Sequence, residues 1–288
     1  MGWIARFVRE QTGDKMAGNG LGRQDGLDQS DFDPSSRRKM QITAWRVVVA
    51  VALIGLWWLV AFYLGDNFIP SPYETWVSAL KLSKDPALPA AISNTMFVFL
   101  SGYGLAILFA IPLGLMMGGL RMFGAALEPY VDALSATPRV SFIPLIIVFL
   151  GLGFEAKIFI VFLGAVMPIL INTYAGVLNS DADLIEMARA AGATQTQVFR
   201  KVMLPGALPY VIAGMRVGAG LALINTVVAE LYTAVGGLGG LLSIYGNTFR
   251  MGPYFVIVLL LAFIGLLTMQ VLRFIERRLT RGYSRHSI

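Results

Sequence analysis

Long apolar runs separated by short polar segments dominate this chain of 288 residues. A run must reach roughly 20 residues of α-helix to cross the ~30 Å hydrocarbon layer of a membrane. Six runs meet this length, at 44–64, 95–117, 131–150, 158–178, 208–231 and 254–272. The pattern therefore predicts an all-α polytopic membrane protein with six transmembrane helices.

Four polar residues interrupt the third and fifth of these runs and are candidates for lining a substrate pathway: Arg139, Arg216, Asn225 and Glu230. An arginine that faced lipid at the centre of a span would cost about 2.5 to 3.5 kcal/mol, so both arginines should face protein or water. A guanidinium group suits an anionic substrate. The alternative is structural pairing, for which Asp132, Glu128, Glu230 or a carboxylate of another subunit is available, and asparagines in spans commonly bond neighbouring helices.

The composition supports a membrane protein and narrows its chemistry. Hydrophobic residues make up 56% of the chain and charged residues only 14%, with a mean hydropathy of +0.68. The absence of cysteine excludes disulfides and thiolate metal sites, and His286 alone cannot form a zinc site or a Ser-His-Asp triad. We therefore expect no metal site and no hydrolytic chemistry of these kinds.

The basic residues predict the direction of the spans. With the N-terminus inside, 17 Lys and Arg fall on the cytoplasmic side, and Arg139 and Arg216 lie within spans. The 4 that fall outside are Lys81, Lys84, Lys157 and Arg250. This asymmetry predicts that both termini are cytoplasmic, in a multi-pass protein of the bacterial inner membrane. The net charge of +6 then reflects contact with the inner lipid surface, and no nucleic-acid partner is indicated.

Three regions follow from this topology. Residues 1–43 form a cytoplasmic segment without the apolar core of a signal peptide; its start predicts either a short interfacial helix or a frayed tail, and the remainder a flexible linker. Residues 44–272 form the transmembrane domain, and residues 273–288 form a basic cytoplasmic tail.

A cytoplasmic loop at 180–203 has the pattern of two short helices joined by a bend. Residues 180–183 resemble a capping box that opens the first helix, and Gly192 ends that helix. Residues 194–197 form a second capping box, which opens a helix that continues toward Pro205 and the fifth span. The loop therefore predicts a helix, a glycine bend and a second helix.

The same loop resembles the EAA loop of ABC importer permeases. That pattern is Glu-Ala-Ala, three residues, Gly, nine residues, Ile, one residue and Leu-Pro, and the spacing fits throughout residues 186–205. The matching positions are Glu186, Ala188, Ala191, Gly192, Val202, Leu204 and Pro205. Met187 and Val202 replace the family's Ala and Ile, and both substitutions keep an apolar contact.

Further segments are similar to the nitrate, sulfonate and taurine branch of this family, and the resemblance covers about residues 45–280. They are Ile69-Pro70-Ser71-Pro72 with Trp76, Thr137-Pro138-Arg139 with Pro144, Gly214-Met215-Arg216, Val228-Ala229-Glu230 and Gly236-Gly237-Leu238-Gly239. The last of these we expect to form a tight external turn or gate.

The resemblance implies the permease subunit of a type I binding-protein-dependent importer. Two permease copies, here a homodimer, would form the pathway, two cytoplasmic ATPases would grip the EAA loops through the matching residues, and an external binding protein would deliver substrate. The chain lacks the Gly-x-x-x-x-Gly-Lys-Ser/Thr phosphate loop. We therefore expect a transport subunit that is not an enzyme and carries no cofactor, with ATP and Mg²⁺ bound by the partner ATPase.

The resemblance implies a small anionic substrate, such as nitrate, a sulfonate, taurine or an organic carboxylate. The same branch also carries neutral pyrimidine precursors of thiamine, which is the alternative. A secondary transporter would keep six spans without an ATPase dock, but the sequence has no convincing inverted repeat. An intramembrane enzyme is disfavoured because no catalytic motif accompanies Asp132 or Glu230.

Overall fold

The computed structural model describes residues 34–65, 68–234 and 236–280, and these residues form helices and turns without a strand. The chain divides into two compact units, the first ending at Leu53 and the second beginning at Ile54. Helix α2 (Pro34–Leu64) starts in the first unit and ends in the second. The expected interfacial helix near the N-terminus and the end of the basic tail lie outside the described residues.

The second unit contains most of the helices. They are α3 (Pro72–Leu82), α4 (Ala87–Gly119), α5 (Arg121–Ala136), the 3₁₀-helix η1 (Arg139–Phe142), α6 (Ile143–Leu150), α7 (Phe154–Leu178), α8 (Ala182–Ala190), α9 (Gln195–Val198), the π-helix η2 (Phe199–Met203), α10 (Leu204–Thr233), α11 (Gly237–Asn247) and α12 (Met251–Thr280).

Five helical segments in the described residues are long and apolar enough to cross a membrane: Gln41–Leu64, Ala87–Gly119, Phe154–Leu178, Gln195–Thr233 and Met251–Arg278. A sixth span exists only if α5 is joined to the η1–α6 segment, which bends away from it by 82°. The architecture is thus the predicted all-α membrane fold with five to six spans.

The run at 131–150, predicted as one transmembrane helix, is divided in the structure between α5 and the η1–α6 segment. Helix α5 ends at Ala136, Thr137 is extended with φ −79° and ψ 131°, and the chain resumes as a 3₁₀ turn at Arg139. A proline disfavours the helical conformation of the residue before it and has no N–H to donate. Pro138 therefore splits an apolar run that hydropathy alone presents as one helix.

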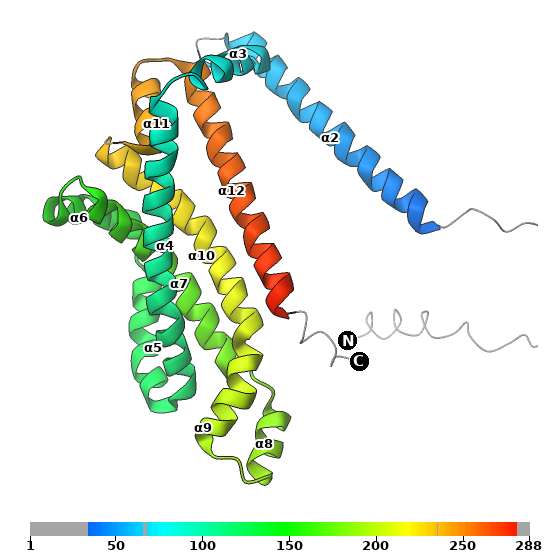
Figure 1. The fold of residues 1–288 in the computed structure, drawn as a ribbon, viewed down its shortest axis with the longest axis vertical. Coiled ribbons are helices and arrows are strands. Elements are labelled where there is room, and N and C mark those ends of the chain that lie inside the picture. Colours follow the sequence, from blue (N-terminus) through cyan, green and yellow to red (C-terminus); the bar gives the residue numbers. More distant parts are fainter. Residues whose placement is uncertain (1–33, 66–67, 235, 281–288) are drawn as a thin grey trace, which may run out of the picture. The chain divides into compact units, whose positions relative to one another are not determined.

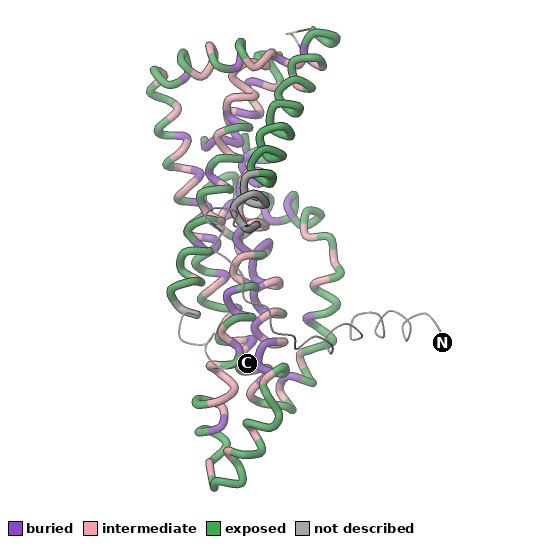
Figure 2. Tube along the Cα trace, turned by 90° about the vertical axis from the view of Figure 1, so that its right-hand side faces the viewer, coloured by how far each residue is buried: buried purple, intermediate pink, exposed green. Residues whose placement is uncertain are grey.

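Helix α7 lies at the centre of the second unit and packs against α4 on one side and α10 on another. Buried residues are concentrated along these three helices (Figure 2). Small residues permit this packing: Gly218 of α10 lies against Ile169 of α7, and a Cβ there would come within 2.7 Å of the Ile169 side chain.

The short helices mark the two ends of this bundle. Helices α8 and α9 project at one end, and α3 and α11 lie at the opposite end (Figure 1). At the α3 end the indole N–H of Trp57 donates to the Pro70 carbonyl at 3.0 Å, and Ser71 caps α3 by accepting the Glu74 amide at 3.2 Å. The long helices therefore separate two ends with different local structures.

Candidate coupling loop and substrate pathway

The first helix of the 180–203 loop begins one residue later than the sequence suggests. Asp181 is the N-cap of α8, and its carboxylate accepts the amides of Asp183 at 2.9 Å and Leu184 at 3.3 Å. The capping box predicted at 180–183 is therefore wrong, because the Ser180 hydroxyl turns back and donates to the Val177 carbonyl at 2.8 Å. An acidic N-cap also complements the helix dipole.

The bend and the second capping box are confirmed. Gly192 has a φ of +80°, in the left-handed region where a side chain is strained, and it separates α8 from α9. The Thr194 hydroxyl accepts the Gln197 amide at 3.4 Å, and the Gln197 side chain accepts the Thr194 amide at 2.8 Å. These reciprocal bonds fix the start of α9.

The residues that match the EAA pattern divide into an outer and an inner group. Glu186, Ala191 and Gly192 are exposed, and Ala188 is half-buried. Val202, Leu204 and Pro205 are half-buried where the loop joins α10. The loop consequently offers the surface of α8 and the glycine bend to a partner, while its second half is attached to the bundle.

A π-helical segment, η2, connects α9 to α10. Such segments are rare and often occur at functional sites. Val198 just before it is almost completely buried, at 1% exposure, and Phe199 is half-buried. The sequence analysis did not predict the π-turn, because hydrophobic periodicity does not distinguish one extra residue in a turn.

Arg139 lies in the break between α5 and α6 and reaches the middle of α7. Its Nη1 donates to the Gly164 carbonyl at 2.9 Å. Asn225 of α10 packs on the same glycine, since a Cβ on Gly164 would lie 2.6 Å from the Asn225 Cγ. Two of the four candidate pathway residues, from different helices, therefore meet at Gly164.

The expected helix face that would pair Asp132 with Arg139 does not exist, because the chain bends between them. Glu128 of α5 instead has a side-chain hydrogen bond with Tyr174 of α7. Arg139 is half-buried and donates to a neutral carbonyl. Its positive charge is therefore not balanced by the carboxylate seven residues before it.

Arg216 and Asn225 have partners in the helical bundle. Arg216 forms an ion pair with Glu276 of α12, a carboxylate that the sequence analysis did not consider. The Asn225 side-chain amide donates to the Leu221 carbonyl of its own helix at 2.8 Å. Arg216 is 39% exposed in its side chain, so this pair lies partly open to the surroundings.

Glu230 is buried, with 1% exposure, at the end of α10. Its carboxylate accepts the Thr95 hydroxyl at 2.9 and 3.0 Å and the Gly239 amide at 2.8 Å, and the Leu238 amide donates to the same hydroxyl at 2.8 Å. Lys157, also buried at 3% exposure, interacts electrostatically with it. We call these five residues the Glu230 cluster.

The glycine-rich segment after α10 belongs to this cluster. Gly236 is the N-cap of α11 and Gly237 its first residue, so the predicted tight turn is a helix start. A Cβ at position 239 would come 2.6 Å from the Glu230 Cβ, so only glycine allows this approach. Lys157 was expected in an external loop but lies in α7. In the sequence, the glycines that follow Glu230 were the only hint that the backbone after α10 could approach the Glu230 carboxylate.

The described residues contain no group of three or more His, Cys, Asp or Glu side chains that could hold a metal ion.

Comparisons with known proteins agree with this arrangement. The family described as "Binding-protein-dependent transport system inner membrane component" matches residues 106–281. A probable ABC transporter permease of Brucella abortus is 33% identical over 232 residues, covering 81% of this chain and 92% of that protein. The taurine transport system permease of Escherichia coli is 29% identical, covering 79% and 86%. The nitrate import permease of Synechocystis is 26% identical, covering 80% and 86%.

Two solved structures share the fold. The inward-facing MetNI methionine ABC transporter has a chain with a TM-score of 0.55 and 22% identity, which covers 68% of this chain and 95% of its own. An amino acid ABC transporter has a chain with a TM-score of 0.59 and 19% identity, covering 70% and 97%. The family match spans more than half of the sequence and includes the 180–203 loop. The chain therefore belongs to the inner-membrane permeases of binding-protein-dependent ABC importers.

Proposed function

We propose that this permease forms the membrane pathway of a type I importer for a small oxyanion, and that its α8–α9 loop docks a separate ATPase. The observation that carries the proposal is the form of this loop. It projects from one end of the bundle (Figure 1), is fixed by two helix caps, and exposes Glu186, Ala191 and Gly192. The residues that match the EAA pattern run from α8 through the glycine bend and η2 to the start of α10.

The geometry explains why these residue types suit docking. Small residues at 188 and 191 allow a partner surface to approach the α8 backbone closely, and Glu186 offers one exposed charge. Gly192 has a φ of +80° and no atom within 4 Å of the place a Cβ would take, and it sets the angle between α8 and α9. ATP and Mg²⁺ would be bound by the partner, and this chain would supply the mechanical contact.

Co-purification of the ATPase tests the docking surface. Glu186→Lys reverses the exposed charge, and Gly192→Pro demands a φ near −65° where the chain has +80°. We expect both variants to insert in the membrane and to lose most of the bound ATPase. Retention of the ATPase at the parental level in both variants would refute the docking role.

Matched controls exist away from the α8–α9 loop, on α3 and after α6. Glu74→Lys reverses an exposed charge on α3. Gly151→Pro imposes the same backbone conflict, because Gly151 has a φ of +76° and is equally unobstructed. Both control variants should retain the ATPase. Loss of the ATPase in the controls would assign the effect to general misfolding.

The proposed anionic substrate rests on Arg139. Its guanidinium is half-buried at a break in a span, bonds a neutral carbonyl through one nitrogen, and has further N–H groups with which to bind an oxyanion. Relatives named as taurine and aliphatic sulfonate permeases of Escherichia coli and a nitrate permease of Synechocystis support this substrate class. Glu230, in contrast, is buried and bonded to Thr95 and Gly239 of this chain.

The remaining partners follow from the same proposal. A second copy of this chain completes the pathway, and an extracytoplasmic binding protein delivers the substrate at the α3–α11 end. The distribution of basic residues supports cytoplasmic termini, with 17 Lys and Arg on the side of the α8–α9 loop.

A further inference from the structure

The corner between α4 and α5 has close contacts within itself and with two other segments, α7 and η2. Gly118 lies against the Val177 side chain of α7, and Gly124 of α5 lies against the Met117 carbonyl. Gly119 lies against Phe199 of η2, where a Cβ would come within 2.7 Å of the ring carbon Cε2. The Phe199 contact is the connection from the α8–α9 loop to this corner.

Phe199 stands at the first position of the π-helical segment, between α9 and α10. A π-turn holds one residue more than an α-turn, so converting it to α-helix rotates the residues before it by about 100° relative to α10. That rotation would carry the ring away from Gly119. Conversion between the two helical forms would give the segment two discrete arrangements, the property that a coupling element requires.

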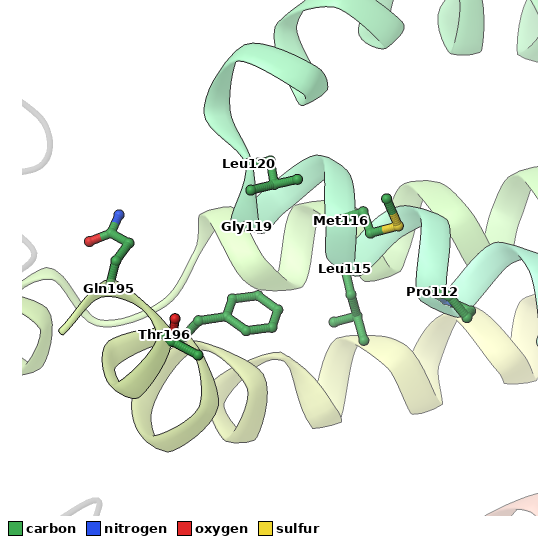
Figure 3. Close-up of a pocket in the computed structure, with 8 residues that line it drawn as sticks. Pro112, Leu115, Met116, Gly119, Leu120, Gln195 and Thr196 are labelled. Carbon is green, nitrogen blue, oxygen red and sulfur yellow. The ribbon is translucent and has the colours of Figure 1, made fainter.

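A cavity of about 410 Å³ beside this contact gives the ring room to move. Its lining is mainly apolar, from the end of α4 and the start of α9, and Figure 3 shows Leu115 and Met116 on one side and Gln195 and Thr196 on the other. Phe199 and Gly119 both belong to this lining. A displaced ring would remain among apolar side chains.

We propose that Phe199 is a positioning residue that passes movement of the docking loop to the α4–α5 corner through its contact with Gly119. The inference rests on the proposed docking of an ATPase to α8 and α9. Helix α5 leads from this corner to the break that holds Arg139. The loop would therefore act on the broken span directly, in addition to its covalent connection through α10.

Hydrogen exchange of the assembled permease–ATPase complex, with and without ATP and vanadate, tests the proposal without a substrate. In the parental complex, nucleotide should change amide exchange both in the α8–α9 loop and at residues 115–124. In Phe199→Ala the change in the loop should remain. In Phe199→Ala the nucleotide-dependent change at 115–124 should fall by about fivefold or more, within the usual range of coupling between sites. The separate variant Phe199→Leu, which keeps an apolar side chain, should retain most of the change.

Two control variants separate the contact from general effects of substitution. Phe263→Ala removes an exposed ring from α12, and the response at 115–124 should stay parental. Gly119→Ala pushes against the Phe199 ring, whereas Gly104→Ala on the same helix meets nothing within 4 Å. We expect Gly119→Ala to weaken the response, Gly104→Ala to leave it unchanged, and the double variant Gly119→Ala/Phe199→Leu to recover it.

The outcomes distinguish this inference from the proposed function. If the parental complex does not form, the docking role fails first. If nucleotide changes exchange in the α8–α9 loop but 115–124 does not respond, docking stands and the role of Phe199 is overturned. The same conclusion holds if 115–124 responds in Phe199→Ala and Gly119→Ala as strongly as in the parental complex. Should Phe199→Ala fail to assemble, the Gly119→Ala and Gly104→Ala pair gives the same comparison.

Discussion

Glu230 shows why a charged residue in a span need not touch substrate. Its carboxylate accepts hydrogen bonds from the Thr95 hydroxyl, which lies near both carboxylate oxygens, and from the Gly239 amide, and Lys157 supplies an opposite charge. Breaking a buried pair of this kind is costly because it leaves a charge without compensation. The cluster joins α4, α7, α10 and α11, so its evident role is to fix these helices together.

A substitution at Thr95 tests how much the Glu230 cluster stabilises the protein, because the Thr95 hydroxyl both accepts from the Leu238 amide and donates to Glu230. Thr95→Val keeps the shape but leaves the amide without this acceptor. We expect a loss of about 1 to 3 kcal/mol in the free energy of unfolding, measured by thermal or denaturant unfolding in detergent, with Thr95→Ser close to the parental protein.

Thr226→Val is the matched control for this change. Thr226 is equally buried in α10, but its hydroxyl bonds only the Ala222 carbonyl of its own helix, at 2.8 Å. If Thr226→Val destabilised the protein as much as Thr95→Val does, the hydrogen bonds of Thr95 to other helices would add nothing to the free energy of unfolding.

Arg139→Gln removes the guanidinium charge but keeps a donor for the Gly164 carbonyl. We expect the assembled transporter to form normally and uptake of an anionic probe such as taurine to fall at least about tenfold, as expected when a charged hydrogen bond of about 1.5 to 3 kcal/mol is lost. Uptake in proteoliposomes and the yield of the complex are the two measurements. Arg273→Gln, at an exposed arginine of α12, should change neither.

The double variant Arg139→Gln/Asp132→Asn separates anion binding from pairing with Asp132. Because Arg139 bonds Gly164 and the chain bends after Ala136, removing the Asp132 charge should restore nothing. Recovery of both yield and uptake in the double variant would contradict the assignment of Arg139 to the substrate.

For the helices, the sequence predicted those features that depend on residues close together in the chain. Apolar runs predicted the long helices, and the side-chain pattern at 194–197 predicted the capping box of α9. The run at 131–150 was predicted as one helix but forms two segments that meet at a bend, because hydropathy measures transfer to lipid and does not report the backbone conformation that Pro138 imposes. The extra residue in the π-turn of η2 was not predicted either, because the hydrophobic pattern does not report the local backbone hydrogen bonding.

The sequence did not predict which polar side chains from distant segments contact each other. Glu276 is 60 residues from Arg216, and Thr95 is 135 residues from Glu230. Each partner taken alone is an ordinary polar residue in or near an apolar run. Only the packing of α4, α10 and α12 determines which of them meet.

The ion pair between Arg216 and Glu276 gives a prediction for α10 and α12. Arg216→Gln should lower the unfolding free energy by about 1 kcal/mol, a modest effect because both side chains are about one-third exposed. The exchanged pair Arg216→Glu/Glu276→Arg should recover most of that loss in detergent unfolding. An exchanged pair no more stable than either single variant would argue against a stabilising contact.

For the whole molecule, the distribution of basic residues predicts that both termini and the α8–α9 loop face the cytoplasm. Docking of a cytoplasmic ATPase to the loop requires this orientation. A reporter inserted near Gly192 and another fused after Ile288 should both be active only in a form that functions in the cytoplasm. A reporter inserted between Lys81 and Lys84, at the end of α3, should show the opposite behaviour. Periplasmic activity at either of the first two sites would refute the orientation and, with it, docking of a cytoplasmic ATPase.

The central claim is that this chain moves substrate only as the permease of an ATP-driven importer. The most direct measurement is uptake of taurine and of nitrate by proteoliposomes that contain the permease alone, with its ATPase, or with the ATPase and binding protein. The account predicts accumulation of at least one of these anions only in the complete system with ATP. Accumulation by the permease alone, driven by an ion gradient and unaffected by ATP, would contradict it.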